Sequence, residues 1–286
     1  MRKLNILEKA PAKLNLTLNV LGKRNDSYHE IEMITTTIDL SDQVELIPID
    51  KNEIKVSLTT RFVPNDERNL AYIAAQHIKE KWNIKHGVHI KMKKSIPVSA
   101  GLGGGSSDAA AVLRGLNRLW DLQMTEAELA HLGIKIGSDV PFCVYSKTAL
   151  VRGRGENIAF LNKPPSCWVV LAKPDIGVST RFVFENLKLE NMCKATTKNM
   201  IHAIKNKDFH SICKYTNNVL EPIILRSYPE VKRIKQKMIQ LGALGVGMSG
   251  SGPTIYGLVK QEKKGKSIYN GLRGFCRNVY LVRMLG

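Results

Sequence analysis

The sequence has no long apolar run, no paired cysteine motif and few aromatic residues. No stretch approaches the ~20 apolar residues of a membrane span, and the first residues, MRKLNILEKAPAK, lack the apolar core of a signal peptide. The five cysteines are scattered and never spaced as CxxC, which argues against a disulfide framework and a zinc site. We therefore expect a cytoplasmic globular protein without a membrane anchor.

Acidic residues are scarce in the second half of the chain. Residues 151–286 carry 23 lysines and arginines against 8 acids, a net charge of +15, whereas residues 1–150 carry 20 against 17. This asymmetry indicates two parts with different surfaces, and the basic part is open to anionic partners. We favour a simpler interpretation for the basic cluster at Val231–Leu241. Its lysines cover the solvent-exposed face of a predicted helix whose opposite face is apolar, so no ligand is needed to explain them.

The most informative segment is Pro97–Ala110, PVSAGLGGGSSDAA. Alternation over Val88–Met92 predicts a strand before it, and helical spacing over Ser107–Trp120 predicts a helix after it, capped by Ser106 or Ser107. A strand, a glycine loop and a helix N-terminus together favour an anion site, because backbone N–H groups and the helix dipole point at the ligand. The alternative is a glycine-rich turn that serves close packing only.

This loop differs from the two commonest phosphate loops. The chain contains no Gly-Lys-Ser/Thr tripeptide, so the loop is not a Walker A motif. Ser106 stands where a dinucleotide fingerprint needs its third glycine. A lysine for the phosphates is therefore expected from elsewhere in the sequence.

Three other places carry residues suited to phosphate chemistry. Lys13 and Asn15 belong to the polar face of a strand predicted at Leu14–Val20, where the alternative is an edge strand with a wet face. Asp139 is suited to orienting a hydroxyl, or else serves as an ordinary helix N-cap. A second glycine turn, Gly245–Thr254, suggests that a phosphate is held from two sides.

Strand and helix patterns alternate, so we predict an α+β chain in two halves, 1–162 and 163–286, with the Pro164–Pro165 turn as the best linker signal. Further strands are predicted at 43–47, 54–58, 168–172, 254–259 and 278–283. Further helices are predicted at 69–82, 125–134, 196–206, 208–224 and 229–241, the second of these opened by a Thr125–Glu128 capping box.

In order along the chain, PAKLNL, GLGGGSSDAA and MSGSGPT resemble the three motifs of the GHMP kinase superfamily of small-molecule kinases, over essentially the whole chain. The resemblance implies an N-terminal domain like ribosomal protein S5 domain 2, a ferredoxin-like C-terminal domain and an active site in the cleft between them. It also implies ATP and Mg²⁺, with Ser107 near the metal and Lys13 and Asp139 as catalytic residues. The ATP contacts would come from Pro97, Val98, Ser99, Ala100, Gly101, Leu102, Gly103, Gly104, Gly105, Ser106 and Ser107, with Asn69 and Lys94 on the adenosine side.

The flanking residues resemble those members that phosphorylate an alcohol carrying cytidine diphosphate, in isoprenoid precursor synthesis. Tyr28 and His29 match the cytidine-binding pair, and the other substrate contacts implied are Asn15, Thr180, Phe184, Ser249, Gly250, Ser251 and Gly252. Taken alone, Tyr28 and His29 also fit the start of a strand, and Phe184 also fits a core position. No membrane or specific nucleic-acid partner is implied, and no pattern indicates an oligomeric state.

The sequence departs from the family pattern at Ser27, where glycine is usual, at Leu244, where an acid is common, and at Gly247, where a larger residue is common. Two alternatives stay open: a GHMP kinase for another alcohol such as homoserine or mevalonate, and a basic nucleic-acid-binding or regulatory protein on a kinase-derived scaffold.

Overall fold

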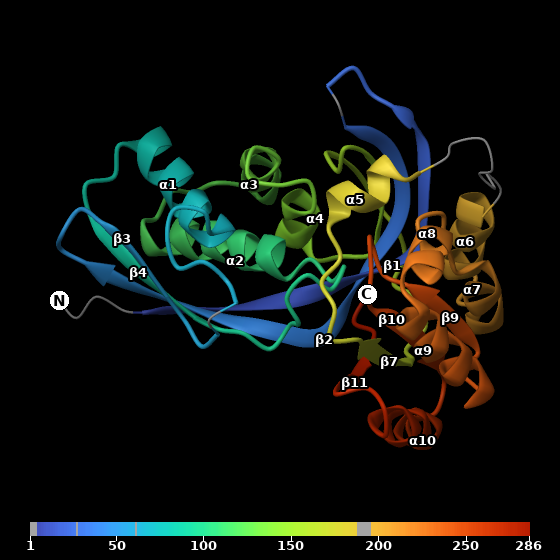
Figure 1. Cartoon of the computed structure of the whole chain (residues 1–286). Coiled ribbons are helices and arrows are strands. Elements are labelled where there is room, and N and C mark those ends of the chain that lie inside the picture. Colours follow the sequence, from blue (N-terminus) through green and yellow to red (C-terminus); the bar gives the residue numbers. More distant parts are fainter. Residues whose placement is uncertain (1–4, 27, 61, 188–195) are drawn as a thin grey trace. The chain divides into compact units, whose positions relative to one another are not determined.

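Two long strands, β1 (Ile6–Lys23) and β2 (His29–Ile49), organise this computed structural model, which describes residues 5–26, 28–60, 62–187 and 196–286. The described residues form two compact units (Figure 1). Neither unit is continuous in sequence, because each long strand contributes to both. The first contains residues up to Ala12, Leu40–Val98 and Gly103–Ser146, and the second contains Lys13–Asp39, Ser99–Leu102 and Lys147–Gly286. The boundary expected between residues 162 and 163 stays a prediction.

The first unit contains a parallel pair of strands joined by a helix. Parallel strands need a crossover, and α1 (Leu70–Trp82) connects β3 (Ile54–Leu58) to β4 (Gly87–Lys93). β4 also pairs antiparallel with β2. Figure 1 shows α1 and the next helices on one side of these strands, and the remaining helices of the unit are α2 (Gly104–Leu119), α3 (Glu126–Gly133) and α4 (Val140–Tyr145).

The helix starts of this unit were predicted with mixed success. Thr125 and Glu128 form the expected capping box. The predicted serine cap of α2 is wrong, because the N-cap is Gly103 in the left-handed region (φ 67°) and no side chain caps the helix. Ser106 and Ser107 therefore lie within the first turns of α2, whose first N–H groups have no intrahelical acceptor.

The second unit contains a four-stranded antiparallel sheet in the order β11-β7-β10-β9. In chain order this is 4-1-3-2, with α10 (Glu262–Arg273) between the third and fourth strands. That arrangement confirms the ferredoxin-like prediction for the C-terminal part. The strands are β7 (Trp168–Lys173), β9 (Gly245–Met248), β10 (Ile255–Val259) and β11 (Asn278–Arg283).

The helix predicted over 208–224 is wrong, because the chain interrupts it at Asn217–Asn218. These two residues form the short strand β8, which pairs in parallel with Thr17 and Leu18 of β1. The segment therefore divides into α7 (Phe209–Tyr215), β8 and α8 (Glu221–Ser227). The remaining helices and strands are β5 (Ala149–Gly153), β6 (Asn157–Phe160), α5 (Thr180–Glu185), α6 (Thr196–Lys205) and α9 (Pro229–Gln240).

Strand β1 is buried on both faces over Ala12–Val20, so the alternative of a wet edge strand is wrong. Among the described residues, β1 lies between β2 and β8 in a sheet of order β3-β4-β2-β1-β8, with β5 on β2 and β6 on β5. Its apolar face belongs to the core. Its polar face is equally hidden, with exposures of 0–4% for Lys13, Asn15, Thr17 and Asn19. Buried polar groups require hydrogen-bond partners, which points to a function for this face.

Candidate active site

The glycine loop has the geometry of an anion-binding turn. It leaves β4 at Lys93 and enters α2 at Gly104, and Gly101 and Gly103 have φ values of 71° and 67°, which favour glycine. Because α2 has no side-chain cap, the N–H groups of its first turn and the positive end of its dipole are left for a ligand. Val98, near the start of the loop, is 38% exposed.

The second glycine turn packs directly against Gly101, within the second unit. A Cβ added to Gly101 would lie 2.1 Å from the carbonyl oxygen of Ser249, so only glycine fits. The hydroxyl of Ser249 donates to the carbonyl oxygen of Gly101 at 2.9 Å. A Cβ at Gly250 would in turn lie 2.9 Å from Lys13 Nζ. The structure therefore brings both glycine motifs and Lys13 together.

Lys13 is a buried ammonium group held by the polar face of β1. Its side chain donates to Asn15 Oδ1 at 2.6 Å, and Asn15 Nδ2 donates to Thr35 Oγ1 at 3.0 Å. The hydroxyl of Tyr256 also donates to the carbonyl oxygen of Asn15 at 2.9 Å. These bonds fix the position of Lys13. Thr35 and Tyr256 carried no signal in the sequence, because they meet Asn15 only through the fold.

Asp139 precedes α4, in the first unit, and is half-buried. It occupies the N-cap position, yet its side chain makes no capping hydrogen bond. The missing capping hydrogen bond weakens the interpretation of this residue as an ordinary N-cap. Its predicted catalytic role stays a prediction.

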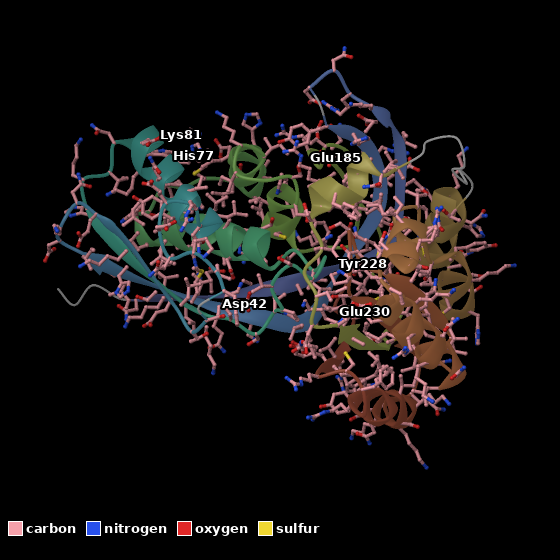
Figure 2. All side chains as sticks on the ribbon, in the orientation of Figure 1. Asp42, His77, Lys81, Glu185, Tyr228 and Glu230 are labelled. Atoms are coloured by element: carbon pink, nitrogen blue, oxygen red, sulfur yellow. The ribbon has the colours of Figure 1, made fainter. Side chains whose placement is uncertain are left out.

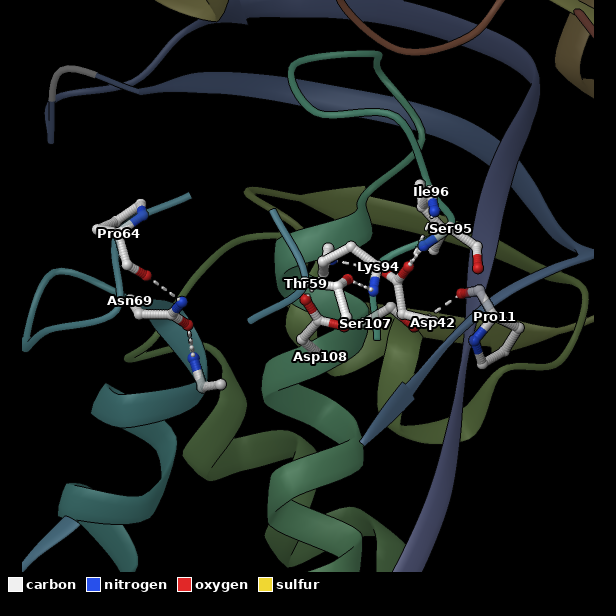
Figure 3. Close-up of polar contacts among 11 residues, drawn as sticks. Pro11, Asp42, Thr59, Pro64, Asn69, Lys94, Ser95, Ile96, Ser107 and Asp108 are labelled. Carbon is white, nitrogen blue, oxygen red and sulfur yellow. Dashed lines mark hydrogen bonds and ion pairs between the residues drawn. The ribbon is translucent and has the colours of Figure 1, made fainter. Parts of the chain in front are cut away.

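Ser107 and Ser106 have different environments on α2. Ser107 is 0% exposed, and its hydroxyl donates to the carbonyl oxygen of Pro11 at 2.7 Å (Figure 3). Ser106 is partly exposed. The prediction that Ser107 lies near a metal ion stays a prediction. The described residues contain no group of three or more His, Cys, Asp or Glu side chains placed to hold a metal.

Lys94 follows β4 and is buried between two carboxylates of the first unit (Figure 3). Its ammonium group donates to Asp42 Oδ2 and Asp108 Oδ2. Burial acts to lower the pKa of Lys94, but the charges of Asp108 and Asp42 outweigh it and the net pKa is raised. Burial raises the pKa of Asp108 to about 7, although Lys94 opposes this. The sequence pattern gave no role to Asp42, which is 52 residues from Lys94.

Asn69 is the N-cap of α1 (Figure 3). Its Oδ1 accepts from the N–H of Ala71 at 2.9 Å, and its Nδ2 donates to the carbonyl oxygen of Pro64 at 2.6 Å. Asn69 is 5% exposed. The expected contact with adenosine stays a prediction, and the capping role is established by the geometry.

The predicted cytidine contacts lie in the second unit. The rings of His29 and Phe184 stack with centroids 4.9 Å apart and an interplanar angle of 29°. Burial, and then the charge of Lys23, lowers the pKa of His29, so its imidazole is neutral near pH 7. Tyr28 is 49% exposed, and the guanidinium carbon of Arg154 lies 4.6 Å from its ring centroid.

Thr180 and Ser251, both expected near the substrate, share a 2.9 Å hydrogen bond between their hydroxyls. Thr180 is the first residue of α5, the helix that also carries Phe184. The second glycine turn is thereby linked to the helix that supplies the stacked ring. Gly252, the last of the predicted substrate contacts in that turn, has a φ of 80°.

The departures from the family pattern have different structural settings. Ser27 lies outside the described residues, and Leu244 is 52% exposed. Gly247 lies in β9, where an added Cβ would be 2.7 Å from Thr216 Cγ2 and 3.0 Å from Tyr256 Oη. Glycine at this position leaves room for the tyrosine that supports β1.

Comparison with known proteins agrees with this arrangement. The model "GHMP kinases N terminal domain" matches residues 69–147, and "GHMP kinases C terminal" matches residues 200–278. The chain belongs to the GHMP kinases, and it is an ATP-dependent small-molecule kinase.

Its relatives narrow the class further. The 4-diphosphocytidyl-2-C-methyl-D-erythritol kinase of Bacillus velezensis is 58% identical over 99% of this chain and 98% of its own length. The enzyme of the same name from Bacillus subtilis is 57% identical over the same shares. A crystal structure of 4-(cytidine 5'-diphospho)-2C-methyl-D-erythritol kinase matches with a TM-score of 0.83 and 31% identity, over 98% of this chain and 100% of that one.

More distant structures share the fold alone. A homoserine kinase from Cytophaga hutchinsonii has a TM-score of 0.80 at 20% identity and covers 98% of this chain, with 94% of its own length matched. In the described part of the chain, no helix is long and apolar enough to cross a membrane. Four cysteines fall within the described residues, and all four are buried.

Proposed function

We propose that the chain transfers the γ-phosphoryl group of ATP to the 2-hydroxyl of 4-diphosphocytidyl-2-C-methyl-D-erythritol, a step in isoprenoid precursor synthesis. The observation that carries the substrate assignment is the stacked pair of His29 and Phe184, and Tyr28, the residue before His29, is half-exposed. A flat heteroaromatic base fits such a group, because aromatic faces stack and a neutral imidazole offers one donor and one acceptor.

The glycine loop binds the phosphates of ATP in this proposal. Loop N–H groups and the uncapped start of α2 supply donors for the negative charges. Mg²⁺ in nucleotide kinases takes few protein ligands besides phosphate oxygens, so one serine hydroxyl of α2 suffices. Ser106 is more accessible than Ser107 for this contact. When bound, the ion neutralises charge on the phosphates.

Lys13 and Asp139 carry the chemistry. The substrate hydroxyl oxygen bonds to the γ-phosphorus as the bond to the β,γ-bridging oxygen breaks and ADP leaves. Asp139 takes or aligns the hydroxyl proton, and Lys13 neutralises charge on the phosphoryl oxygens. Phosphoryl transfer depends mainly on positioning and charge, so few groups are needed. The buried Lys13–Asn15 contact supports the positioning of the lysine.

The substrate contacts follow from the second unit. Tyr28 and Phe184 stack on or beside the cytosine, His29 hydrogen-bonds it, and Asn15 lies on the methylerythritol side. Thr180 and the turn Ser249–Gly252 complete the substrate side. Support comes from the contacts of this turn with Lys13 and Gly101.

A panel of alcohols tests the proposal. ADP release is measured with 4-diphosphocytidyl-2-C-methyl-D-erythritol, homoserine and mevalonate at saturating ATP. We expect kcat/KM for the cytidine-bearing alcohol to exceed the others by at least about a hundredfold, because the other alcohols leave the base site unfilled. A preference for an alcohol without cytidine contradicts the substrate assignment. No ADP release, with tight and steeply salt-dependent oligonucleotide binding, contradicts the kinase assignment.

A further inference from the structure

Two carboxylates and one ammonium group form a buried cluster in the first unit, next to the segment that leads into the glycine loop. Asp42 comes from β2, Asp108 from α2, and Lys94 from the segment after β4 (Figures 2 and 3). Their side chains are 0%, 4% and 6% exposed, respectively. A lone buried charge is strongly unfavourable, so each member of the cluster depends on the others.

Asp42 holds the start of the loop through one of its two carboxylate oxygens. Asp42 Oδ1 accepts from the N–H groups of Ser95 and Ile96, the latter at 2.8 Å. Its other oxygen accepts from Lys94, whose own N–H donates to Thr59 Oγ1 at 3.0 Å. The three residues that lead into the loop are therefore fixed by hydrogen bonds to Asp42 of β2 and to Thr59, which follows β3.

Asp108 holds the exit of the loop. It lies in the second turn of α2, one turn after Gly104, and accepts from Lys94 Nζ. A Cβ added to Gly104 would lie 3.1 Å from Ile96 Cγ2, so the first residue of the helix already packs against the loop entrance. Lys94 thus connects the segment before the loop with the helix after it.

We propose that Lys94, Asp42 and Asp108 act as a brace that fixes the phosphate-binding loop, and that Lys94 is a positioning residue rather than a ligand of the nucleotide. This inference rests on the proposed binding of ATP at the loop. Preorganised backbone donors bind phosphate well because little reorganisation is needed when the ligand arrives. Two donors of Lys94 are already used by the two carboxylates.

The brace also limits negative charge near the phosphates. With both carboxylates ionised, the cluster would carry a net charge of −1 beside the loop. The raised pKa of Asp108, caused first by burial and opposed by Lys94, leaves much of this carboxyl protonated near neutral pH. With a pKa of about 7, the net charge of the cluster lies between −1 and 0 at neutral pH, so the cluster repels the ligand less than two ionised carboxylates would.

The test compares Asp108→Ala with Asp108→Asn and measures binding of ATP and of inorganic tripolyphosphate by calorimetry, with KM for ATP and kcat. We expect Asp108→Ala to weaken both ligands by about tenfold, the effect of losing about 1.4 kcal/mol. Asp108→Asn keeps an acceptor for Lys94 and should lose at least about fivefold less affinity than Asp108→Ala. KM for ATP should rise in parallel, while kcat and KM for the alcohol change less.

Asp39→Asn is the matched control, because Asp39 is an exposed carboxylate three residues before Asp42 on β2. Loss of ATP affinity with unchanged tripolyphosphate affinity overturns the brace, because it assigns the cluster to the adenosine side. Equal binding of both ligands by Asp108→Ala and wild type overturns it as well. Failure of the wild type to bind ATP at all instead contradicts the proposed function.

Discussion

The ammonium group of Lys13 donates a 2.6 Å hydrogen bond to the side-chain oxygen of Asn15, on the buried polar face of β1. The same amide donates to Thr35, so Asn15 is fixed from its other end. The hydrogen bonds thus orient the lysine before any ligand binds. The expected consequence is that Asn15 affects the rate of transfer more than the affinity for ATP.

Asn15→Ala should lower kcat about tenfold with a small change in KM for ATP, because a hydrogen bond to a charged group contributes about 1.5–3 kcal/mol. Steady-state kinetics of ADP release measures this. The control is Asn52→Ala, which removes an exposed asparagine that accepts from Lys79 at 2.7 Å. An Asn15→Ala enzyme as fast as Asn52→Ala would show that Lys13 needs no such support.

Gly101→Ala should destabilise the fold by about 2 kcal/mol or more and remove most activity. The positive φ of 71° disfavours alanine, and the added Cβ would lie 2.1 Å from the oxygen of Ser249. Urea unfolding gives the free energy of unfolding. Gly274→Ala serves as the control because nothing lies within 4 Å of its Cβ. Similar stabilities for the two variants would contradict the close packing of the glycine turns.

Phe184→Ala should raise KM for the cytidine-bearing alcohol about threefold to tenfold, because it removes the ring stacked on His29. KM for ATP should stay within about twofold, since Phe184 belongs to the substrate contacts. Phe182→Ala, on the same helix and 37% exposed, is the matched control. A rise in KM for ATP alone would contradict the assignment of this helix to the alcohol substrate.

Asp108→Asn should flatten the pH dependence of stability. The folded protein holds the Asp108 proton up to a pKa of about 7, whereas the unfolded chain releases it near pH 4. The wild type therefore has this stability in full below about pH 4 and loses it as the pH rises to about 7, by on the order of a few kcal/mol. Lys94 does not contribute in this window, because its raised pKa lies far higher.

Urea unfolding of the wild type and Asp108→Asn from pH 4.5 to 8 measures this loss. The gap between their free energies of unfolding should shift in favour of Asp108→Asn as the pH rises. Parallel curves would show that Asp108 is ionised throughout. Asp39→Asn, at an exposed site, should follow the wild type.

Local patterns predicted much of the fold. The Thr125–Glu128 capping box and strand β3 lie where the sequence placed them, because short-range hydrogen bonding and period-two alternation decide such features. The interruption at Asn217–Asn218 was not predictable in this way, since it depends on pairing with β1. Periodicity carried no information about a partner about 200 residues away in the chain.

For the candidate site, the sequence indicated some residues and missed others. The glycine turns were recognisable from their composition, and the structure brings Gly101 against Ser249. Alternation of polar residues in β1 could not distinguish a solvated face from a buried one. Asp42 escaped notice because a lone aspartate in a strand has no local signature, and its importance arises only when the fold brings Lys94 to it.

The central claim is that Asp139 takes part in phosphoryl transfer to the cytidine-bearing alcohol. The most direct measurement is single-turnover ADP formation by the wild type and Asp139→Asn with saturating ATP and 4-diphosphocytidyl-2-C-methyl-D-erythritol. We predict a rate at least about a hundredfold lower for Asp139→Asn, with ATP affinity within about threefold, because general-base catalysis contributes about 10²–10⁴-fold. Equal single-turnover rates for the two proteins would contradict the account.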